Sequence, residues 1–288
     1  MTSALHWTPF PAGHTGRLAL RGESVAAATL DRLGVWGAPR TPARAAVSPV
    51  RAPGWPVIGE HAVHWGPGRL DLASGEFAAA DGLLALCDHG RRVPQAWAWR
   101  DDGERVLACL AGGGPGRGGR TQAVLADAAG HAVAGLRDDP EAAAPAACLG
   151  RSVAVVGSAR ASLHAPDGRL LLRLDNPTPA LRLVLCADES MLLLVENGRL
   201  SLHGVAGGEL RARWEGAWID AAASPDGRRL LALDLQGRLV VLDARDAGAP
   251  PLALPADDPA QAVAADERHL LAAFARGAPL RRCRWPPV

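Results

Sequence analysis

The side chains best suited to chemistry in this sequence are its arginines, histidines, carboxylates and thiols, because the chain contains no lysine. The lack of lysine excludes Schiff-base catalysis, a lysine general base and the lysine of a phosphate-binding P-loop. The sequence also has no G-x-S-x-G or H-E-x-x-H motif and no catalytic-triad signature. We therefore predict a protein that is not an enzyme and that holds no cofactor and no metal ion.

The segment AGGGPGRGGR, residues 111–120, is a candidate for anion binding. Its backbone N–H groups, together with Arg117 and Arg120, could surround a phosphate. A phosphate loop runs from a strand into a helix, however, and this segment joins two expected strands. We favour a flexible hairpin insertion on one rim of the fold, where Arg117 and Arg120 could contact a partner protein.

The histidines and cysteines lack the spacing of metal ligands. His61 and His64 in HAVHW lie three residues apart, so on a strand they point to opposite faces, and no further ligand is nearby. The five cysteines lie far apart without a C-x-x-C pair, which indicates small buried side chains in a reducing compartment. They are Cys87, Cys109, Cys148, Cys186 and Cys283.

Acidic residues concentrate in expected turns, where aspartate can accept hydrogen bonds from nearby backbone N–H groups. Turn geometry therefore explains these carboxylates without chemistry, although a calcium site or a carboxylate pair in a central channel is an alternative. The residues concerned are Asp101, Asp102, Asp167, Asp226, Asp257 and Asp258.

The chain has nine tryptophans and only three phenylalanines. We expect most of the indole rings to pack between neighbouring sheets, where large side chains fill the available space. Trp97 and Trp99 share one face of an expected strand. Since tryptophan and arginine dominate binding hot spots, Trp97 and Trp99 join Arg117 and Arg120 as candidate partner contacts.

These residues must be positioned by short strands, as the stretch ASPDGRRLLALDLQGRLVVLDARD shows. Residues 224–227 have turn chemistry, residues 230–233 form an apolar run, Gln236-Gly237 turns the chain, and residues 239–242 return. The apolar runs are nearly continuous, so both faces of this hairpin should be buried. Stacked sheets would bury both faces.

The same pattern recurs along the chain. The turn glycines Gly198, Gly237 and Gly277 are 39 and 40 residues apart in the numbering, and Ser158-Ala159 lies about one period earlier. Between two of these units, AWIDAAA supplies a fourth strand. Four short strands per period of this length is the repeat of a propeller blade, and no convincing amphipathic helix separates the strands.

The sequence therefore predicts an all-β fold in which residues 1–288 form a single β-propeller domain with four-stranded blades. Residues 97–136 fit one blade, residues 57–90 hold a hairpin near Pro67-Gly68, and residues 36–56 show no clear strand pattern. Length divided by period predicts seven blades, with six as the alternative. We expect an N-terminal strand, residues 5–7 or 17–23, to pair with residues 280–285 and so remove a free sheet edge.

The segments SPDGRRLLA, QGRLVVLD and ENGRLSLH resemble those of the WD-repeat-like and quinoprotein-like β-propeller superfamily, mainly across residues 146–285. Strict WD repeats open with Gly-His and close with Trp-Asp, and Leu242-Asp243 is the nearest match here, so the hydrogen-bond network of those repeats is not implied. The chain also resembles the propeller components of bacterial ternary systems that contain a MoxR-type ATPase and a von Willebrand A-domain protein. That resemblance implies those two proteins as partners.

The formal net charge of +1 argues against a general nucleic-acid binder. The N-terminal residues lack the pattern of a signal peptide, and no apolar run is long enough for a membrane helix. We expect a cytoplasmic protein–protein interaction scaffold without nucleic-acid or membrane partners. The alternatives are a propeller hydrolase or lactonase, or a small-molecule-binding propeller, with its site at the central channel.

Overall fold

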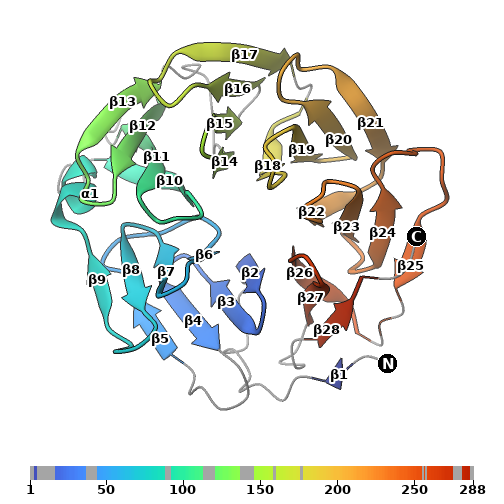
Figure 1. The fold of residues 1–288 in the computed structure, drawn as a ribbon, viewed down its shortest axis with the longest axis horizontal. Coiled ribbons are helices and arrows are strands. Elements are labelled where there is room, and N and C mark those ends of the chain that lie inside the picture. The colour runs from blue at the N-terminus through green and yellow to red at the C-terminus, as the bar shows by residue number, and fades with distance from the viewer. Residues whose placement is uncertain are drawn as a thin grey trace.

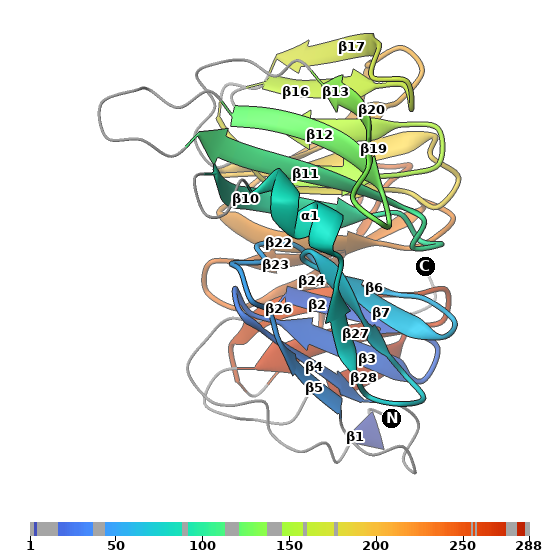
Figure 2. The same cartoon turned by 90° about the vertical axis from the view of Figure 1, so that its left-hand side faces the viewer.

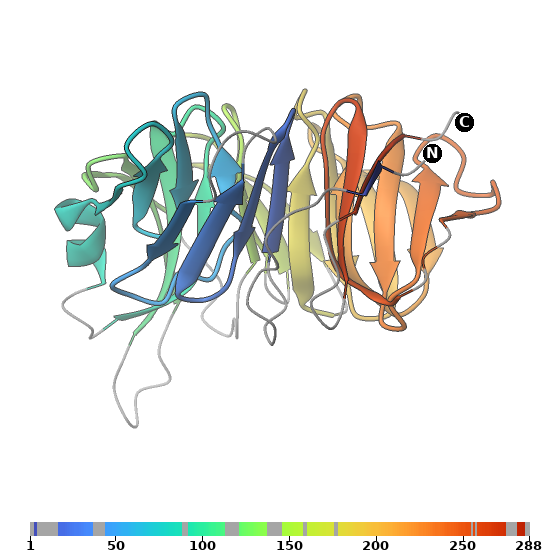
Figure 3. The same cartoon turned by 90° about the horizontal axis from the view of Figure 1, so that it is seen from below.

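A computed structural model describes residues 3–4, 17–36, 44–87, 92–112, 121–136, 146–157, 160–175, 178–254, 256, 258–274 and 281–285. The chain forms seven four-stranded antiparallel sheets arranged as blades around a central axis (Figure 1). The prediction of an all-β propeller with seven blades is confirmed, and the six-bladed alternative is wrong. Figure 3 shows the resulting disc from its side, with the strands running between the two ring faces.

The first four blades are formed in chain order. They contain β2 (Arg17–Arg21), β3 (Ser24–Ala28), β4 (Arg32–Trp36) and β5 (Arg44–Val47); then β6 (Val57–Ile58), β7 (Ala62–Trp65), β8 (Gly68–Asp71) and β9 (Phe77–Ala79); then β10 (Arg92–Trp99), β11 (Arg105–Gly112), β12 (Thr121–Asp127) and β13 (Ala132–Leu136); then β14 (Ala146–Leu149), β15 (Ala154–Gly157), β16 (Arg160–His164) and β17 (Leu170–Asp175).

The last three blades follow the same order, except that the final sheet takes its outer strand from the N-terminal region. They contain β18 (Ala180–Leu185), β19 (Met191–Glu196), β20 (Arg199–Gly204) and β21 (Leu210–Glu215); then β22 (Trp218–Ala223), β23 (Arg229–Asp234), β24 (Leu239–Asp243) and β25 (Leu252–Leu254); then β26 (Ala260–Ala265), β27 (His269–Phe274), β28 (Arg281–Arg284) and β1 (Ser3–Ala4).

Two of the predicted turns lie where the sequence places them. Gly198 joins β19 to β20 and Gly237 joins β23 to β24, with φ of 94° and 81°, values that favour glycine. Gly277 and Ser158-Ala159 lie outside the described residues.

The prediction that AWIDAAA forms a strand is confirmed. The segment forms β22, which is the first strand of the sixth blade and pairs with β23. Each blade therefore begins one strand earlier than the hairpin pattern suggests, because the strand nearest the axis follows directly from the outer strand of the preceding blade.

The last sheet contains strands from both ends of the chain. Ser3 and Ala4 pair antiparallel with Arg282 and Arg281. Residues 17–21, one of the two expected closing segments, instead form the inner strand β2 of the first blade; residues 5–7, the other one, lie outside the described residues. The side chain of Arg282 also donates to the carbonyl oxygen of Gly22 at 3.1 Å, so the last and first blades are linked directly.

The first half of the chain holds one feature that the sequence did not predict. The helix α1 (Asp81–Leu86) follows β9 on the outer side of the ring, as Figure 2 shows, and buries Leu83. Residues 57–79 form one complete blade, and β4 and β5 occupy part of the region without a clear strand pattern.

The hydrophobic core is divided among the interfaces between successive blades. One buried cluster joins the fifth and sixth blades, with Leu200 and Trp214 facing Leu230 and Leu242, and equivalent clusters join the other neighbours. Each blade is therefore covered on both faces, as its continuous apolar runs predict. Tryptophans fill these interfaces, which confirms their core interpretation; Trp36, Trp65, Trp97, Trp99, Trp214, Trp218 and Trp285 are all buried.

Candidate binding site at the central channel

Four of the seven inner strands have a backbone irregularity near the end where they enter the ring. The pairing register skips one residue in β10, β18, β22 and β26, at Gln95, Leu181, Ile219 and Gln261. Such a bulge changes the direction of the extra side chain. All four residues line the mouth of the central channel, so the repeated bulge shapes this face of the ring.

Trp55 lies at the centre of the channel because of the backbone segment that precedes it. Gly54 forms a parallel bridge with Trp97 of β10, and the N–H of Trp97 donates to the carbonyl of Pro53 at 2.8 Å. A Cβ on Gly54 would overlap the carbonyl oxygen of Trp97. Only glycine permits this close approach, which carries Trp55 across the channel.

A buried ion pair lies against the ring of Trp55. Arg182 of β18 donates to the carboxylate of Asp220 on β22, and both side chains are about nine-tenths buried. Asp220 also accepts from the N–H groups of Ala221 at 2.9 Å and Val263 at 3.0 Å. These hydrogen bonds replace the hydration that the Asp220 carboxylate loses on burial, as a buried charge requires.

Arg17 of β2 completes the cluster and differs from Arg182 in its partners. Its guanidinium carbon lies 4.8 Å from the centre of the Trp55 ring, and that of Arg182 lies 4.5 Å away. Within the described residues, no hydrogen bond or ion pair neutralises Arg17. Burial and, next, the positive charge of Arg182 lower the pKa of Arg17.

The cavities around this cluster open on opposite faces of the ring. One, of about 620 Å³, is lined by Arg17, Arg51, Asp31 and Gln261, and a second of about 390 Å³ adjoins it at Trp55. Both lie at the face where the inner strands begin. A third cavity, about 270 Å³, lies along the other ends of the inner strands and is also bounded by Trp55. Trp55 therefore separates the two ends of the channel.

The predicted partner-contact residues lie apart from this cluster or outside the described residues. Trp97 and Trp99 are only 2% and 5% exposed. Trp99 donates through its indole N–H to the carbonyl of Gly66 at 2.9 Å, whereas Trp97 lines the second cavity. Arg117 and Arg120 lie outside the described residues. Partner contact through these four residues stays a prediction.

The two histidines of HAVHW occupy different environments, but not as opposite faces of one strand, because His61 precedes β7 and His64 lies within it. His61 is exposed, whereas His64 is buried with its ring 5.0 Å from that of Trp99. Burial and, next, the charge of Arg69 lower the pKa of His64. Within the described part of the chain, no group of three histidine, cysteine, aspartate or glutamate side chains is arranged to hold a metal ion.

Several of the acidic turn residues accept the backbone hydrogen bonds that their position predicts. Asp102 accepts from the N–H of Glu104 at 2.9 Å, Asp167 from that of Arg169 at 2.9 Å, and Asp226 from that of Arg228 at 3.1 Å. Asp257 lies outside the described residues.

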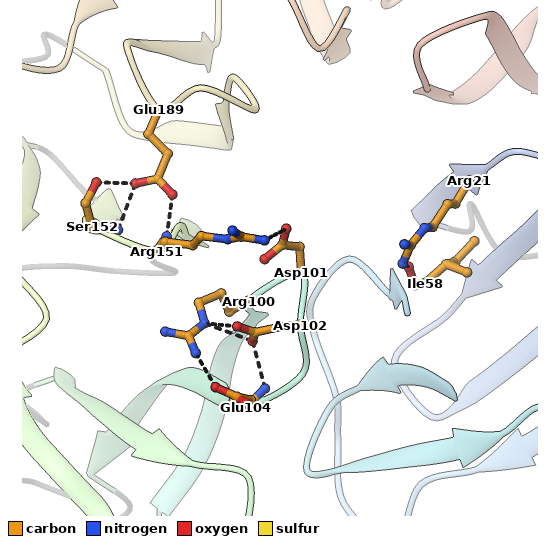
Figure 4. A network of polar contacts seen from close by, with 9 residues as sticks. All are labelled: Arg21, Ile58, Arg100, Asp101, Asp102, Glu104, Arg151, Ser152 and Glu189. Atoms are coloured by element: carbon orange, nitrogen blue, oxygen red, sulfur yellow. Dashed lines mark hydrogen bonds and ion pairs between the residues drawn. The ribbon is translucent and has the colours of Figure 1, made fainter. Parts of the chain in front are cut away.

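The opposite ring face carries a polar network across blade boundaries (Figure 4). Arg151 of the fourth blade bonds Asp101 of the third at 3.2 Å. Glu189 of the fifth blade accepts from the backbone N–H groups of Arg151 and Ser152 and from the Ser152 hydroxyl. Burial by itself would raise the pKa of Glu189, but these hydrogen bonds outweigh it and hold that pKa below its usual value. This network fastens neighbouring blades together.

The residues of the channel cluster, Arg17, Trp55, Arg182 and Asp220, were not predicted as a site. The available signal was a charged residue inside an otherwise apolar strand, as in ALRLVL for Arg182 and WIDAAA for Asp220. Such a residue must find a buried partner, and blades meeting at one axis provide it. Of the helices within the described ranges, none has the length and apolar character needed to cross a membrane.

No protein-family model matches this chain, and no curated protein matches it in sequence. Solved structures share its fold. The crystal structure of the computationally designed Ika8 protein matches with a TM-score of 0.62 and 11% identity, over 95% of this chain and 98% of that chain. A chain in the crystal structure of the Mitotic Checkpoint Complex matches with a TM-score of 0.70 and 13% identity, over 100% of this chain and 94% of that chain. At these identities the likeness shows the seven-bladed β-propeller fold alone.

Proposed function

We propose that this propeller is a non-enzymatic scaffold that binds protein partners at the ring face where the inner strands begin. The cavity of about 620 Å³ opens on this face, and Leu30 and Leu181, which line it, are 39% and 47% exposed. Arg17 and Trp55 line the same cavity. Arginine and tryptophan are the residue types that dominate protein-binding hot spots, and their contact at the channel mouth carries the proposal.

The resemblance noted in the sequence names specific partners for this scaffold. It supports an accessory subunit of a bacterial, cytoplasmic system in which the propeller binds a MoxR-type ATPase and a von Willebrand A-domain protein.

The test is capture of partners from native lysate by the wild-type chain and by two surface variants. Leu181→Asp places a charge at the cavity edge, and Leu171→Asp places the same charge on the outer strand β17, where Leu171 is 44% exposed. We expect Leu181→Asp to lose stoichiometric partners that Leu171→Asp retains, as quantified by mass spectrometry. Equal recovery by both variants would contradict the proposed face. The MoxR assignment further requires the ATPase and the A-domain protein to be among the lost partners.

A further inference from the structure

The guanidinium of Arg17 is the unusual group at the channel mouth. Arg17 is the first residue of β2, and its guanidinium lies over the ring of Trp55. It makes no hydrogen bond or ion pair among the described residues, and Asp220, the carboxylate whose charge acts on it, is already bonded to Arg182. The equivalent charge on Arg182 is neutralised by Asp220. A partly buried guanidinium that stacks on an indole keeps its N–H donors available in the plane of the fork, where a carboxylate can accept them.

Among the described residues, the charges around Trp55 and the larger cavity leave an excess of one positive charge. Arg17, Arg51 and Arg182 contribute three positive charges, and Asp31 and Asp220 contribute two negative charges. A singly charged anion would balance this set. A phosphate group near neutral pH carries more than one negative charge and would meet Asp31 and Asp220 as well.

The shape of the mouth fits a chain better than a single small molecule. The cavities of about 620 and 390 Å³ adjoin along Arg17, Trp55 and Leu181. Together they extend from the side of β22 and β26 to the side of β10 and β14. The exposed side chains of Leu30 and Leu181 lie at the edge of the larger cavity, so apolar residues on either side of the anion would also be covered.

We infer that the channel mouth is a carboxylate-binding site, in which Arg17 receives an Asp or Glu side chain from an extended, otherwise apolar segment of a protein partner. This inference rests on the proposed scaffold function and specifies what the partner must present. Gln261, beside Arg17 in the larger cavity, offers a further polar contact. Arg17 is thus the residue that selects the charge of the segment.

The experiment uses the full chain, labelled with ¹⁵N, and the capped tripeptides acetyl-Leu-Glu-Leu-amide and acetyl-Leu-Gln-Leu-amide. The indole N–H of Trp55 is buried and without a hydrogen-bond partner among the described residues, so its resonance reports directly on the mouth. Trp55→Phe assigns that resonance. We expect the glutamate peptide to shift it in a saturable way and the glutamine peptide to bind at least tenfold more weakly, because a charge-assisted hydrogen bond is lost.

The variant Arg17→Gln should abolish this discrimination, so that both peptides bind equally weakly. Leu181→Asp provides a second variant at an exposed position and should weaken the glutamate peptide about tenfold by like-charge repulsion. Leu235→Asp is its matched control, since Leu235 is 68% exposed and does not line either cavity. Leu235→Asp should bind the glutamate peptide as the wild-type chain does.

Four results would overturn the carboxylate site: no saturable shift with the glutamate peptide, equal affinity for both peptides, unchanged discrimination in Arg17→Gln, or equal effects of the two leucine variants. Acetate and inorganic phosphate complete the titration. If acetate bound as tightly as the glutamate peptide, the inference of an extended segment would be wrong. If inorganic phosphate bound more tightly than the glutamate peptide, the inference of a carboxylate ligand would be wrong. The titration needs no partner protein, so its failure is distinct from failure of the capture experiment.

Discussion

Gly54 determines the position of Trp55, and Trp55 in turn separates the two ends of the central channel. The segment holding Gly54 runs against β10 so closely that a Cβ would overlap the carbonyl oxygen of Trp97. Gly54→Ala must therefore push the backbone away from β10 or distort the bridge between them. We expect the free energy of unfolding to fall by about 1–3 kcal/mol, the range for overpacking, together with a changed environment of Trp55.

This prediction is checked by urea unfolding and by the indole resonance of Trp55. Gly135→Ala on β13 is the matched control, because a Cβ there meets nothing within 4 Å. An unfolding midpoint of Gly54→Ala equal to that of the wild-type chain would contradict this prediction, because the backbone would then accommodate the Cβ without loss of stability.

Single residues were predicted unevenly from the sequence. The turn carboxylates and the buried tryptophans follow from local rules, since a turn or an apolar strand is specified by a few adjacent residues. Arg17, Trp55, Arg182 and Asp220 come from four different inner strands or connections. Their meeting depends on the closure of the whole ring, which no local pattern encodes.

Contacts between blades depend on hydrogen bonds as well as on apolar packing. On the face shown in Figure 4, the Glu189 carboxylate accepts three hydrogen bonds from Arg151 and Ser152. Because the pKa of Glu189 is lowered in the folded chain, its stabilising effect is present above the unfolded value near 4.5 and is lost as pH falls through the folded value.

We expect Glu189→Gln to lower the free energy of unfolding by about 0.5–1 kcal/mol at pH 7, a modest value because the site is partly solvated. The difference from the wild-type chain should shrink as the pH is lowered from 5 to 3. Urea midpoints across this range provide the measurement. Glu60→Gln, which removes an exposed carboxylate on the β6–β7 turn, is the control. A difference that stays constant with pH would contradict the role of the ionised carboxylate.

Strands and hairpins were predicted better than blades. The turns at Gly198 and Gly237 identify hairpins because glycine and its neighbours specify a turn locally. The linear order of strands is the same whichever strand is taken to begin a blade, so the sequence identified AWIDAAA as a strand without showing which blade it belongs to. Packing around the axis decides this, and it places β22 innermost. In the first blade, β5 reads RAAV and has only one buried residue, so its sequence lacks an apolar pattern.

Across the whole molecule, stability is distributed over similar interfaces between blades. The reactivity of cysteine thiols can report whether these interfaces open. Cys148 and Cys186 lie in the fourth and fifth blades. Burial and, next, the charge of Glu189 raise the pKa of Cys148 to about 12; burial and, next, the charge of Asp188 raise that of Cys186 to about 12. At that pKa the thiolate fraction falls roughly 10³-fold below that of a thiol of pKa 9, so both should react very slowly.

We expect a thiol reagent at pH 8 to modify Cys148 and Cys186 with one common protection factor, the ratio of unprotected to native rate, if the ring opens as a single cooperative unit. Mass spectrometry of peptides resolves the two sites, and labelling in denaturant gives the unprotected rate for each. Rapid modification of either thiol under native conditions, or clearly different protection factors for the two, would indicate that single blades detach independently.

The position of Trp55 has a practical consequence for anyone redesigning this protein. Because the indole and its two arginines lie between the cavities of the two ring faces, we expect substitutions on one face to leave the opposite cavity unchanged. The two surfaces can thus be diversified as separate libraries and recombined afterwards. One chain could then bridge two unrelated molecules, each addressed from its own side.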